Sequence, residues 1–136
     1  MLLLRVVAML PRHLVLVLLL AGLLPGPSLA AEPPGRLQAH QVAENVWMAE
    51  GEAALGSKAN RNFISNAGFV VTEEGVLVVD ALGSPALAED LIREIRRVTT
   101  QPIRYLVVTH YHADHIYGLQ AFKAAGHAWR LYCGSR

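Results

Sequence analysis

The densest group of chemically active side chains in the sequence lies at residues 110–115, which read His-Tyr-His-Ala-Asp-His. His110 and His112 are two residues apart, so an extended strand end would project both imidazoles to the same side. Asp114 and His115 follow at once, where the chain must turn out of the strand. Imidazole nitrogens and a carboxylate suit Zn²⁺ and, by ligand type, also Mn²⁺ or iron. The segment therefore predicts a metal site.

The spacing also allows these residues to divide between two ions. The two leading histidines would bind one ion, and Asp114 with His115 would bind a second. Two ions a few Å apart can activate a bridging water and polarise the bond that it attacks. The alternative is a structural histidine-rich loop or an adventitious metal tract. His13, His40 and His127 are isolated, and we expect each to be an ordinary surface or core residue.

A buried strand and the helix before it must position this cluster. Residues 103–109 predict the strand, because Leu106, Val107 and Val108 form an apolar run that ends at His110. Ser84 followed by Pro85 is typical of a helix start, and Gln101-Pro102 ends the helix. The spacing of its apolar residues places one face against a core, with Leu87, Leu91, Ile95 and Val98 on that face.

The residues before this helix predict further strands. Residues 42–48 favour a first strand, and residues 51–62 a loop. Residues 66–71 and 76–80 predict an antiparallel hairpin whose turn closes at Gly75. Residues 76–79 are apolar on both faces, which is typical of a strand inside a layered sheet. Strand, helix and strand in succession indicate a crossover connection, and hence an α/β fold.

Length and composition narrow the class of protein. The chain has 136 residues, enough for one domain, and a single cysteine, which excludes an internal disulfide. Its formal net charge of +1 shows no basic surplus of the kind that nucleic-acid binding requires. We therefore expect no nucleic-acid partner.

Residues 1–30 have the pattern of a signal peptide. Arg5 and Arg12 are their only full charges, residues 14–24 are apolar except for Gly22, and residues 25–27 break any helix. Cleavage after Ala30 would export the chain to the periplasm or the medium with no membrane span; a retained anchor is the alternative. Residues 31–41 then read as a leader, exposed over residues 31–38, and residues 42–136 as the domain.

The His-x-His-x-Asp-His pattern after residues 105–109 resembles the metallo-β-lactamase-fold metallohydrolase superfamily. Asp80, followed by Ala81, Leu82 and Gly83, is similar to the superfamily's turn after its second strand pair, with the glycine one residue late. Residues 66–122 resemble the N-terminal half of its αββα sandwich. Among its branches, the leader and residues 109–118 look closest to periplasmic zinc hydrolases linked to quinoprotein systems.

This resemblance implies a role for each residue of the cluster. His110 and His112 would hold the first zinc ion, and Asp114 and His115 the second. Asp114 would also orient the nucleophilic water and accept its proton, making it the catalytic residue. Asp80 would hydrogen-bond near the cluster and position it, or would serve only as a turn-forming carboxylate. Gly118 would give backbone clearance beside the site, with Leu119 and Phe122 seating the next helix.

The resemblance implies hydrolysis of an ester, thioester or amide-type bond in a small-molecule substrate. Family members take further ligands from a C-terminal half, whereas only His127 and no acidic residue follow His115 here. Cys133 is expected to be a bystander thiol. We therefore expect a truncated or frameshifted member, inactive alone, with residues 128–136 read in a wrong frame and apolar surface exposed around residues 76–79. A small periplasmic zinc-binding module and an iron-dependent redox relative are the alternatives.

Overall fold

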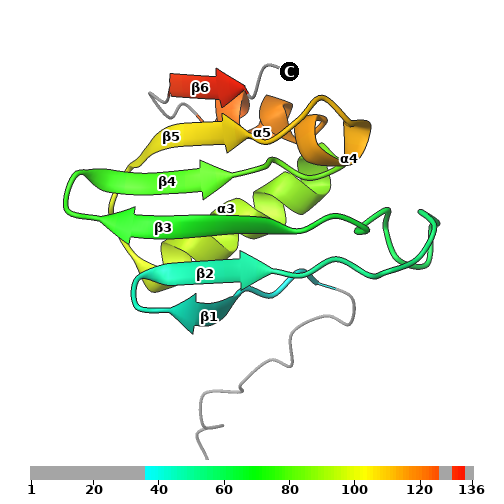
Figure 1. Cartoon of the computed structure of the whole chain (residues 1–136), viewed down its shortest axis with the longest axis horizontal. Coiled ribbons are helices and arrows are strands. Elements are labelled where there is room, and N and C mark those ends of the chain that lie inside the picture. Colours follow the sequence, from blue (N-terminus) through cyan, green and yellow to red (C-terminus); the bar gives the residue numbers. More distant parts are fainter. Residues whose placement is uncertain (1–35, 126–129, 134–136) are drawn as a thin grey trace, which may run out of the picture. The chain divides into compact units, whose positions relative to one another are not determined.

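The computed structural model describes residues 36–125 and 130–133, and these form one mixed α/β layer (Figure 1). Its six strands are hydrogen-bonded in the order β1-β2-β3-β4-β5-β6. The elements follow one another as β1 His40–Ala43, β2 Val46–Ala49, β3 Ala67–Thr72, β4 Gly75–Val79, α3 Pro85–Val98, β5 Ile103–Val108, α4 Ala113–Ile116, α5 Leu119–Ala124 and β6 Arg130–Cys133.

The first predicted strand is in fact a hairpin. Residues 42–48 were expected to be one strand, but β1 and β2 pair antiparallel and are joined by Glu44 and Asn45. Asn45 has a φ of 59°, a left-handed conformation that asparagine tolerates better than most residues. The turn was not predicted because a single asparagine supplies it, without the glycine that usually marks a hairpin.

The second hairpin and the long helix confirm their predictions. β3 and β4 pair antiparallel, with Thr72 opposite Gly75 at the turn. In α3, the Ser84 hydroxyl accepts a hydrogen bond from the backbone N–H of Leu87 at 3.2 Å and so caps the helix. Leu87, like Leu91 and Ile95, is buried, whereas Val98, which was expected on the same face, is 39% exposed.

α3 and α5 lie behind the sheet in Figure 1, and the core lies between these helices and the sheet. β5 runs parallel to β4, as the strand–helix–strand pattern predicted. Successive side chains of a strand point to opposite faces, so alternate residues reach this core. The largest fully buried ones from the strands and from α5 are Phe69, Val76, Val78, Leu106, Val108 and Phe122.

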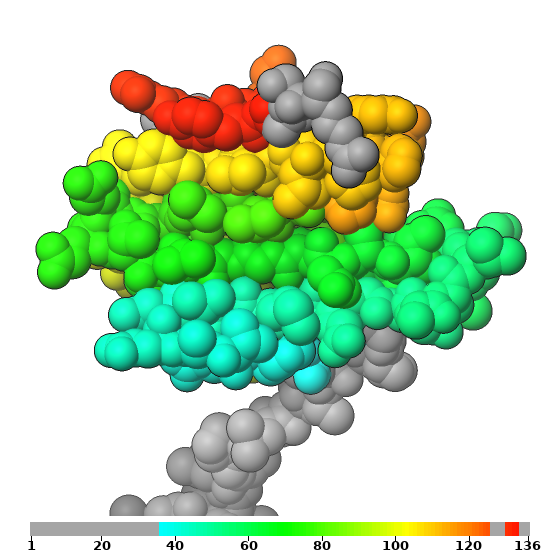
Figure 2. All heavy atoms as spheres, in the orientation of Figure 1, coloured from blue at the N-terminus to red at the C-terminus, as the bar shows by residue number. Residues whose placement is uncertain are grey.

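The opposite face of the sheet, which faces the viewer in Figure 2, carries the alternate side chains of the strands. Strand register places Val70, Leu77 and Tyr105 in one row across β3, β4 and β5. Residues 76–79 were expected to lie inside a layered sheet, with apolar surface left on a face that lacks its second half. Val76 and Val78 lie in the core, and Leu77 and Val79 are half-buried on the opposite face. The pleat of β4 accounts for this alternation, because its two faces have different neighbours.

The sixth strand lies within residues 128–136, which were expected to be a tail read in a wrong frame. Residues 130–133 form β6, which pairs parallel to β5, and the rings of Tyr105 and Tyr132 lie 6.3 Å apart. These residues therefore extend the sheet beyond β5, and the wrong-frame tail stays a prediction. The prediction for His127 lies outside the described residues.

The start of the described chain is packed more closely than expected. Leu37, predicted to lie in an exposed leader, is only 2% exposed and joins the core. The backbone N–H of Ala39 donates to Glu94 of α3 at 3.2 Å, and Arg36 pairs with Asp90 of the same helix. The predicted leader is thus packed against the domain from Arg36 onwards. The predicted signal peptide, residues 1–30, lies outside the described residues, and within them no helix is long and apolar enough to cross a membrane.

Candidate metal centre

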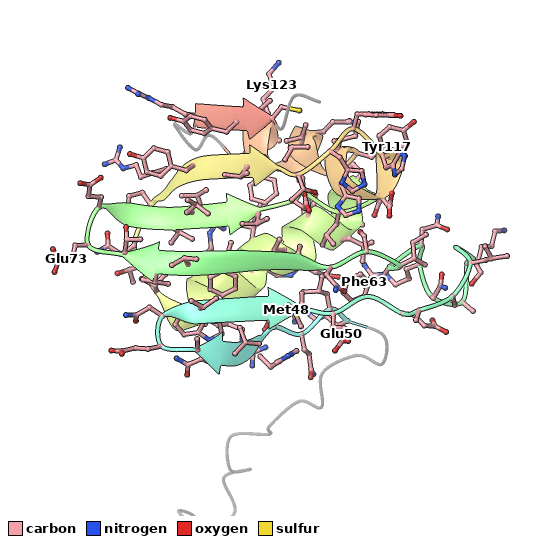
Figure 3. All side chains as sticks on the ribbon, in the orientation of Figure 1. Met48, Glu50, Phe63, Glu73, Tyr117 and Lys123 are labelled. Carbon is pink, nitrogen blue, oxygen red and sulfur yellow. The ribbon has the colours of Figure 1, made fainter. Side chains whose placement is uncertain are left out.

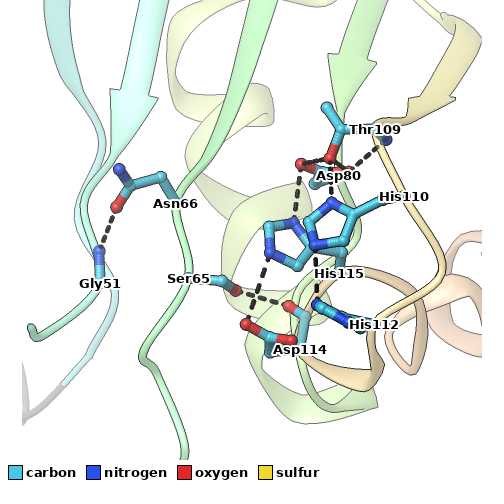
Figure 4. Close-up of polar contacts among 9 residues, drawn as sticks. All are labelled: Gly51, Ser65, Asn66, Asp80, Thr109, His110, His112, Asp114 and His115. Carbon is cyan, nitrogen blue, oxygen red and sulfur yellow. Dashed lines mark hydrogen bonds and ion pairs between the residues drawn. The ribbon is translucent and has the colours of Figure 1, made fainter. Parts of the chain in front are cut away.

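The predicted ligands gather where the parallel strands β4 and β5 end (Figure 4). Asp80 follows β4, and His110 follows β5 after one intervening residue, Thr109. The short helix α4 then carries Asp114 and His115. Tyr117 is labelled at this end of the sheet in Figure 3, whereas Glu73, in the β3–β4 turn, lies at the opposite end. The carboxyl ends of neighbouring parallel strands are a usual place for a functional site in such sheets.

Asp80 is the buried hub of this group. It is 4% exposed and accepts a hydrogen bond from the backbone N–H of Thr109 at 2.8 Å. It also accepts from the Thr109 hydroxyl at 2.8 Å and from Nδ1 of His115 at 2.9 Å. The φ of Asp80 is 63°, a left-handed conformation in which aspartate is enriched. One carboxylate therefore ties the end of β4 to the end of β5 and to α4.

His110 and His112 form the first pair of donors. Nε2 of His110 lies 3.1 Å from Nδ1 of His112. Two nitrogen lone pairs repel at that distance, so a proton or a cation must lie between them. The two rings, which were predicted to project to one side, therefore lie in contact.

Asp114 and His115 form the second pair. Oδ2 of Asp114 lies 3.4 Å from Nε2 of His115. The ring centroids of His110 and His115 are 4.1 Å apart, so the two pairs are neighbours. The four residues predicted from their spacing therefore do lie together, although they are arranged two by two.

Imidazole nitrogens and a carboxylate fit zinc, but each pair has only two donors. Within residues 36–125 and 130–133, no group of three or more His, Cys, Asp or Glu side chains is arranged to hold one ion. A catalytic zinc ion normally has three protein ligands and a water. Each pair would supply two donors to a bound ion, which would need at least one more ligand. Cys133 is exposed in β6.

Two supporting residues were missed by the sequence reasoning. The Ser65 hydroxyl donates to the backbone carbonyl of Asp114 at 2.5 Å, and Ser65 is 6% exposed. The Thr109 hydroxyl lies 2.9 Å from Nδ1 of His110. Ser65 is remote from the cluster in sequence and gives no local signal. Thr109, which directly precedes the first ligand at a strand end, could have been noticed.

The turn after β4 is held tightly against the segment after α4. The backbone N–H of Ala81 donates to the carbonyl of His115 at 2.9 Å, and that of Gly118 donates to Leu82 at 3.0 Å. A Cβ atom at Gly118 would lie 1.8 Å from the carbonyl oxygen of Ala81. The predicted backbone clearance at Gly118 is therefore confirmed. Leu82 has a φ of 68°, which is rare for leucine and marks this turn as strained.

Comparison with known proteins identifies the family. The model of the metallo-beta-lactamase superfamily matches residues 60–132, which include Asp80, the four predicted ligands and most of β6. The chain belongs to the metallo-β-lactamase superfamily. The resemblance predicted from the His-x-His-x-Asp-His pattern is confirmed.

Individual relatives agree with this assignment. The chain is 27% identical over 92 residues to a metallo-beta-lactamase type 2 of Bacillus cereus, an alignment that covers 68% of this chain and 35% of that protein. It is 39% identical over 49 residues to a linear primary-alkylsulfatase of Pseudomonas sp. (strain ATCC 19151), covering 36% of this chain and 9% of that protein. The chain therefore spans about a third of the length of the first relative and 9% of the length of the second.

Solved structures match the fold in the same way. A metallo-beta-lactamase from Erythrobacter litoralis, crystallised with beta mercaptoethanol in its active site, superposes with a TM-score of 0.57 at 28% identity, covering 72% of this chain and 42% of that one. One from Hirschia baltica gives a TM-score of 0.58 at 16% identity, covering 73% and 43%, and shows the fold alone. The α/β layer thus corresponds to part of a metallo-β-lactamase fold, as predicted.

Proposed function

We propose that this chain carries half of the metal-binding centre of a zinc-dependent hydrolase that acts on an ester, thioester or amide-type bond of a small molecule. The observation that carries the proposal is the arrangement of two donor pairs around one buried carboxylate, Asp80, at the carboxyl ends of two parallel strands. Superfamily membership supports a metal-dependent hydrolytic activity.

Each residue has a distinct task in this proposal. Nε2 of His110 and Nδ1 of His112, which lie 3.1 Å apart, would hold one ion. Asp114 and Nε2 of His115 would hold a second. The bound ions would supply a water molecule acidic enough to lose a proton near neutral pH. Asp114, which is only partly buried, would orient that water and accept its proton.

Hydrolysis needs more donors than these two pairs supply. The described residues hold no third donor with either pair, so turnover requires ligands from outside them. Metal binding and hydrolysis are therefore separate predictions. The chain would bind ions through its two pairs, and would hydrolyse a substrate only where the coordination is completed.

Metal analysis tests the first prediction. Full-length chain is purified, exposed to equimolar zinc, iron and manganese, desalted, and analysed for bound metal. Zinc retained by the wild type and by His40→Ala, but lost from His112→Ala, would support the proposal; His40 is an exposed histidine in β1 and serves as the matched control. Predominant iron would favour redox chemistry instead. Equal zinc retention by all three proteins would exclude the proposed ligands.

An activity panel tests the second prediction. A chromogenic β-lactam, a p-nitrophenyl ester, a thioester and an alkyl sulfate cover the proposed bonds and those suggested by the relatives' names. Zinc-dependent turnover of one of them, abolished in His112→Ala, would establish a hydrolase. Stoichiometric, tight zinc binding by a stable monomer with no turnover would favour the zinc-binding module.

We also propose that the chain is exported through residues 1–30. The evidence is the sequence pattern alone: two arginines, an apolar run and small residues before position 31. N-terminal sequencing of the protein recovered from the periplasm tests this. A mature chain beginning at Ala31 would support export, and an uncleaved chain in the membrane fraction would favour the retained anchor.

A further inference from the structure

The side chain of Thr109 joins the buried carboxylate to the first histidine of the cluster. Its hydroxyl oxygen lies 3.0 Å from Oδ1 and 2.8 Å from Oδ2 of Asp80, and 2.9 Å from Nδ1 of His110. A hydroxyl group has one proton to donate and two lone pairs to accept with. These three distances therefore restrict where the protons lie.

The direction of the hydrogen bonds follows from Asp80. A carboxylate only accepts, so the Thr109 hydroxyl must direct its single proton to Asp80. What the hydroxyl then presents to His110 is a lone pair. Nδ1 of His110 must consequently carry a proton, and in the neutral ring Nε2, the atom that faces His112, is then the unprotonated nitrogen.

We propose that Thr109 is a positioning residue that fixes the proton of His110 on Nδ1 and so leaves Nε2 free to bind a metal ion. His115 is fixed in the same way, but directly, because its Nδ1 donates to Asp80 at 2.9 Å. One buried carboxylate thus sets the proton position on a histidine of each donor pair, once directly and once through the Thr109 hydroxyl. Groups that fix the tautomer of a metal-binding histidine typically raise its affinity for the ion.

Among residues 36–125 and 130–133, no carboxylate or hydroxyl group fixes the proton of His112 in this way. Nδ1 of His112 contacts Nε2 of His110 at 3.1 Å. When an ion occupies that position, Nδ1 of His112 must give up any proton it carries, which then resides on Nε2. His110 and His115 would therefore keep their tautomers when metal binds, whereas His112 would change its tautomer.

The test is histidine NMR on the full chain, and its first readout does not depend on the proposed function. Protein labelled with ¹⁵N-histidine is stripped of metal, and long-range ¹H–¹⁵N correlation spectra identify the protonated nitrogen of each ring. In wild type we expect Nδ1–H for His110 and His115. In Thr109→Val, which keeps the side-chain shape, His110 should lose its preference for Nδ1–H, whereas His115 should keep it.

Thr109→Ser restores the hydroxyl and should restore the wild-type spectrum of His110. Thr109 is exposed, so we expect all three proteins to fold alike, and the unchanged His115 signal serves as an internal check. His110 remaining Nδ1–H in Thr109→Val would overturn the proposal. So would an Nε2–H signal for His110 in wild type.

Zinc titration of the same samples supplies the second readout. This part depends on the proposed function. Zinc affinity should fall about 10- to 100-fold in Thr109→Val and stay near wild type in Thr109→Ser. Equal affinity in all three would overturn the link between tautomer and metal. Failure of wild type to bind zinc would instead contradict the proposed function, while the tautomer result would stand.

Discussion

Replacing Asp80 by asparagine distinguishes the two roles that its position allows. Asparagine tolerates the left-handed conformation, φ 63°, as aspartate does, so the turn after β4 should survive. If Asp80 serves only as a turn former, the variant should resemble wild type in every measurement. If it also positions the histidines, the substitution should change their protons.

The asparagine side chain would place a hydrogen-bond donor where a carboxylate oxygen of Asp80 now accepts. The amide oxygen of the new side chain can accept the backbone N–H of Thr109, as Oδ1 does now at 2.8 Å. The amide NH₂ group then takes the place of Oδ2 and faces Nδ1–H of His115, which lies 2.9 Å from that oxygen. Two donors cannot face each other. His115 relieves the conflict by moving its proton to Nε2, the nitrogen proposed to bind metal.

The expected magnitudes follow from these contacts. A hydrogen bond to a charged group contributes roughly 1.5–3 kcal/mol, and the tautomer shift restores part of it, so the free energy of unfolding should fall by about 1–3 kcal/mol. Zinc affinity should fall by about 10- to 100-fold, the usual cost of losing a partner of a metal ligand. We therefore expect a folded protein with a selective loss of metal binding.

Urea denaturation followed by circular dichroism measures the first quantity, and competition against a chelating dye measures the second. Glu73→Gln is the matched control, because it makes the same chemical change in the turn at the opposite end of the sheet. Wild-type zinc affinity in a folded Asp80→Asn protein would refute the positioning role and leave Asp80 as a turn former. Loss of zinc binding together with loss of the folded state would refute the stability argument.

Two further predictions concern the scaffold. Leu106→Ala should lower the free energy of unfolding by about 2–5 kcal/mol, because Leu106 is fully buried and the change leaves a cavity; Leu55→Ala, at a residue that is 91% exposed, should change it by less than about 0.5 kcal/mol in the same urea titration. Gly118→Ala should cost about 1–3 kcal/mol or more, since its methyl group would lie 1.8 Å from the carbonyl oxygen of Ala81. Gly83→Ala, whose nearest atom would be 3.3 Å away, should cost clearly less, and equal melting temperatures would contradict this reasoning.

The sequence predicted those parts of the fold whose signals are local. Ser84 and Pro85 mark the start of α3, and the hairpin of β3 and β4 closes at a glycine. The hairpin of β1 and β2 was missed because Asn45 alone provides its turn. β6 was missed because a short strand at the edge of a sheet depends on its pairing with β5 rather than on its own composition.

The candidate site also has a part that local sequence predicts and a part that depends on contacts distant in sequence. Its four predicted ligands are close in sequence, so their spacing alone brought them together. Ser65 lies 49 residues from its partner Asp114, and Thr109 lies 29 residues from Asp80. Such contacts exist only because the strands align, and no pattern within a single segment encodes them. Asp80 could be placed near the cluster only through the resemblance to the family.

The alignment of β4 with β5 itself depends on one extra residue. Val76 pairs with Ile103, but the next pair is Leu77 with Tyr105, so Arg104 is left without a counterpart on β4. From there the register runs on to Val79 opposite Val107, which brings Asp80 level with Val108, and the backbone N–H of Asp80 donates to Val107 at 2.8 Å. Without the extra residue, Asp80 would lie opposite Val107 instead, and Thr109 would lie one residue further along the strand. A one-residue shift also exchanges the two faces of a strand, so both the core and the hydrogen bonds of Asp80 would be lost together. The irregularity lies at the far end of the strands, yet it decides whether the carboxylate meets the hydroxyl and the histidines that it orders.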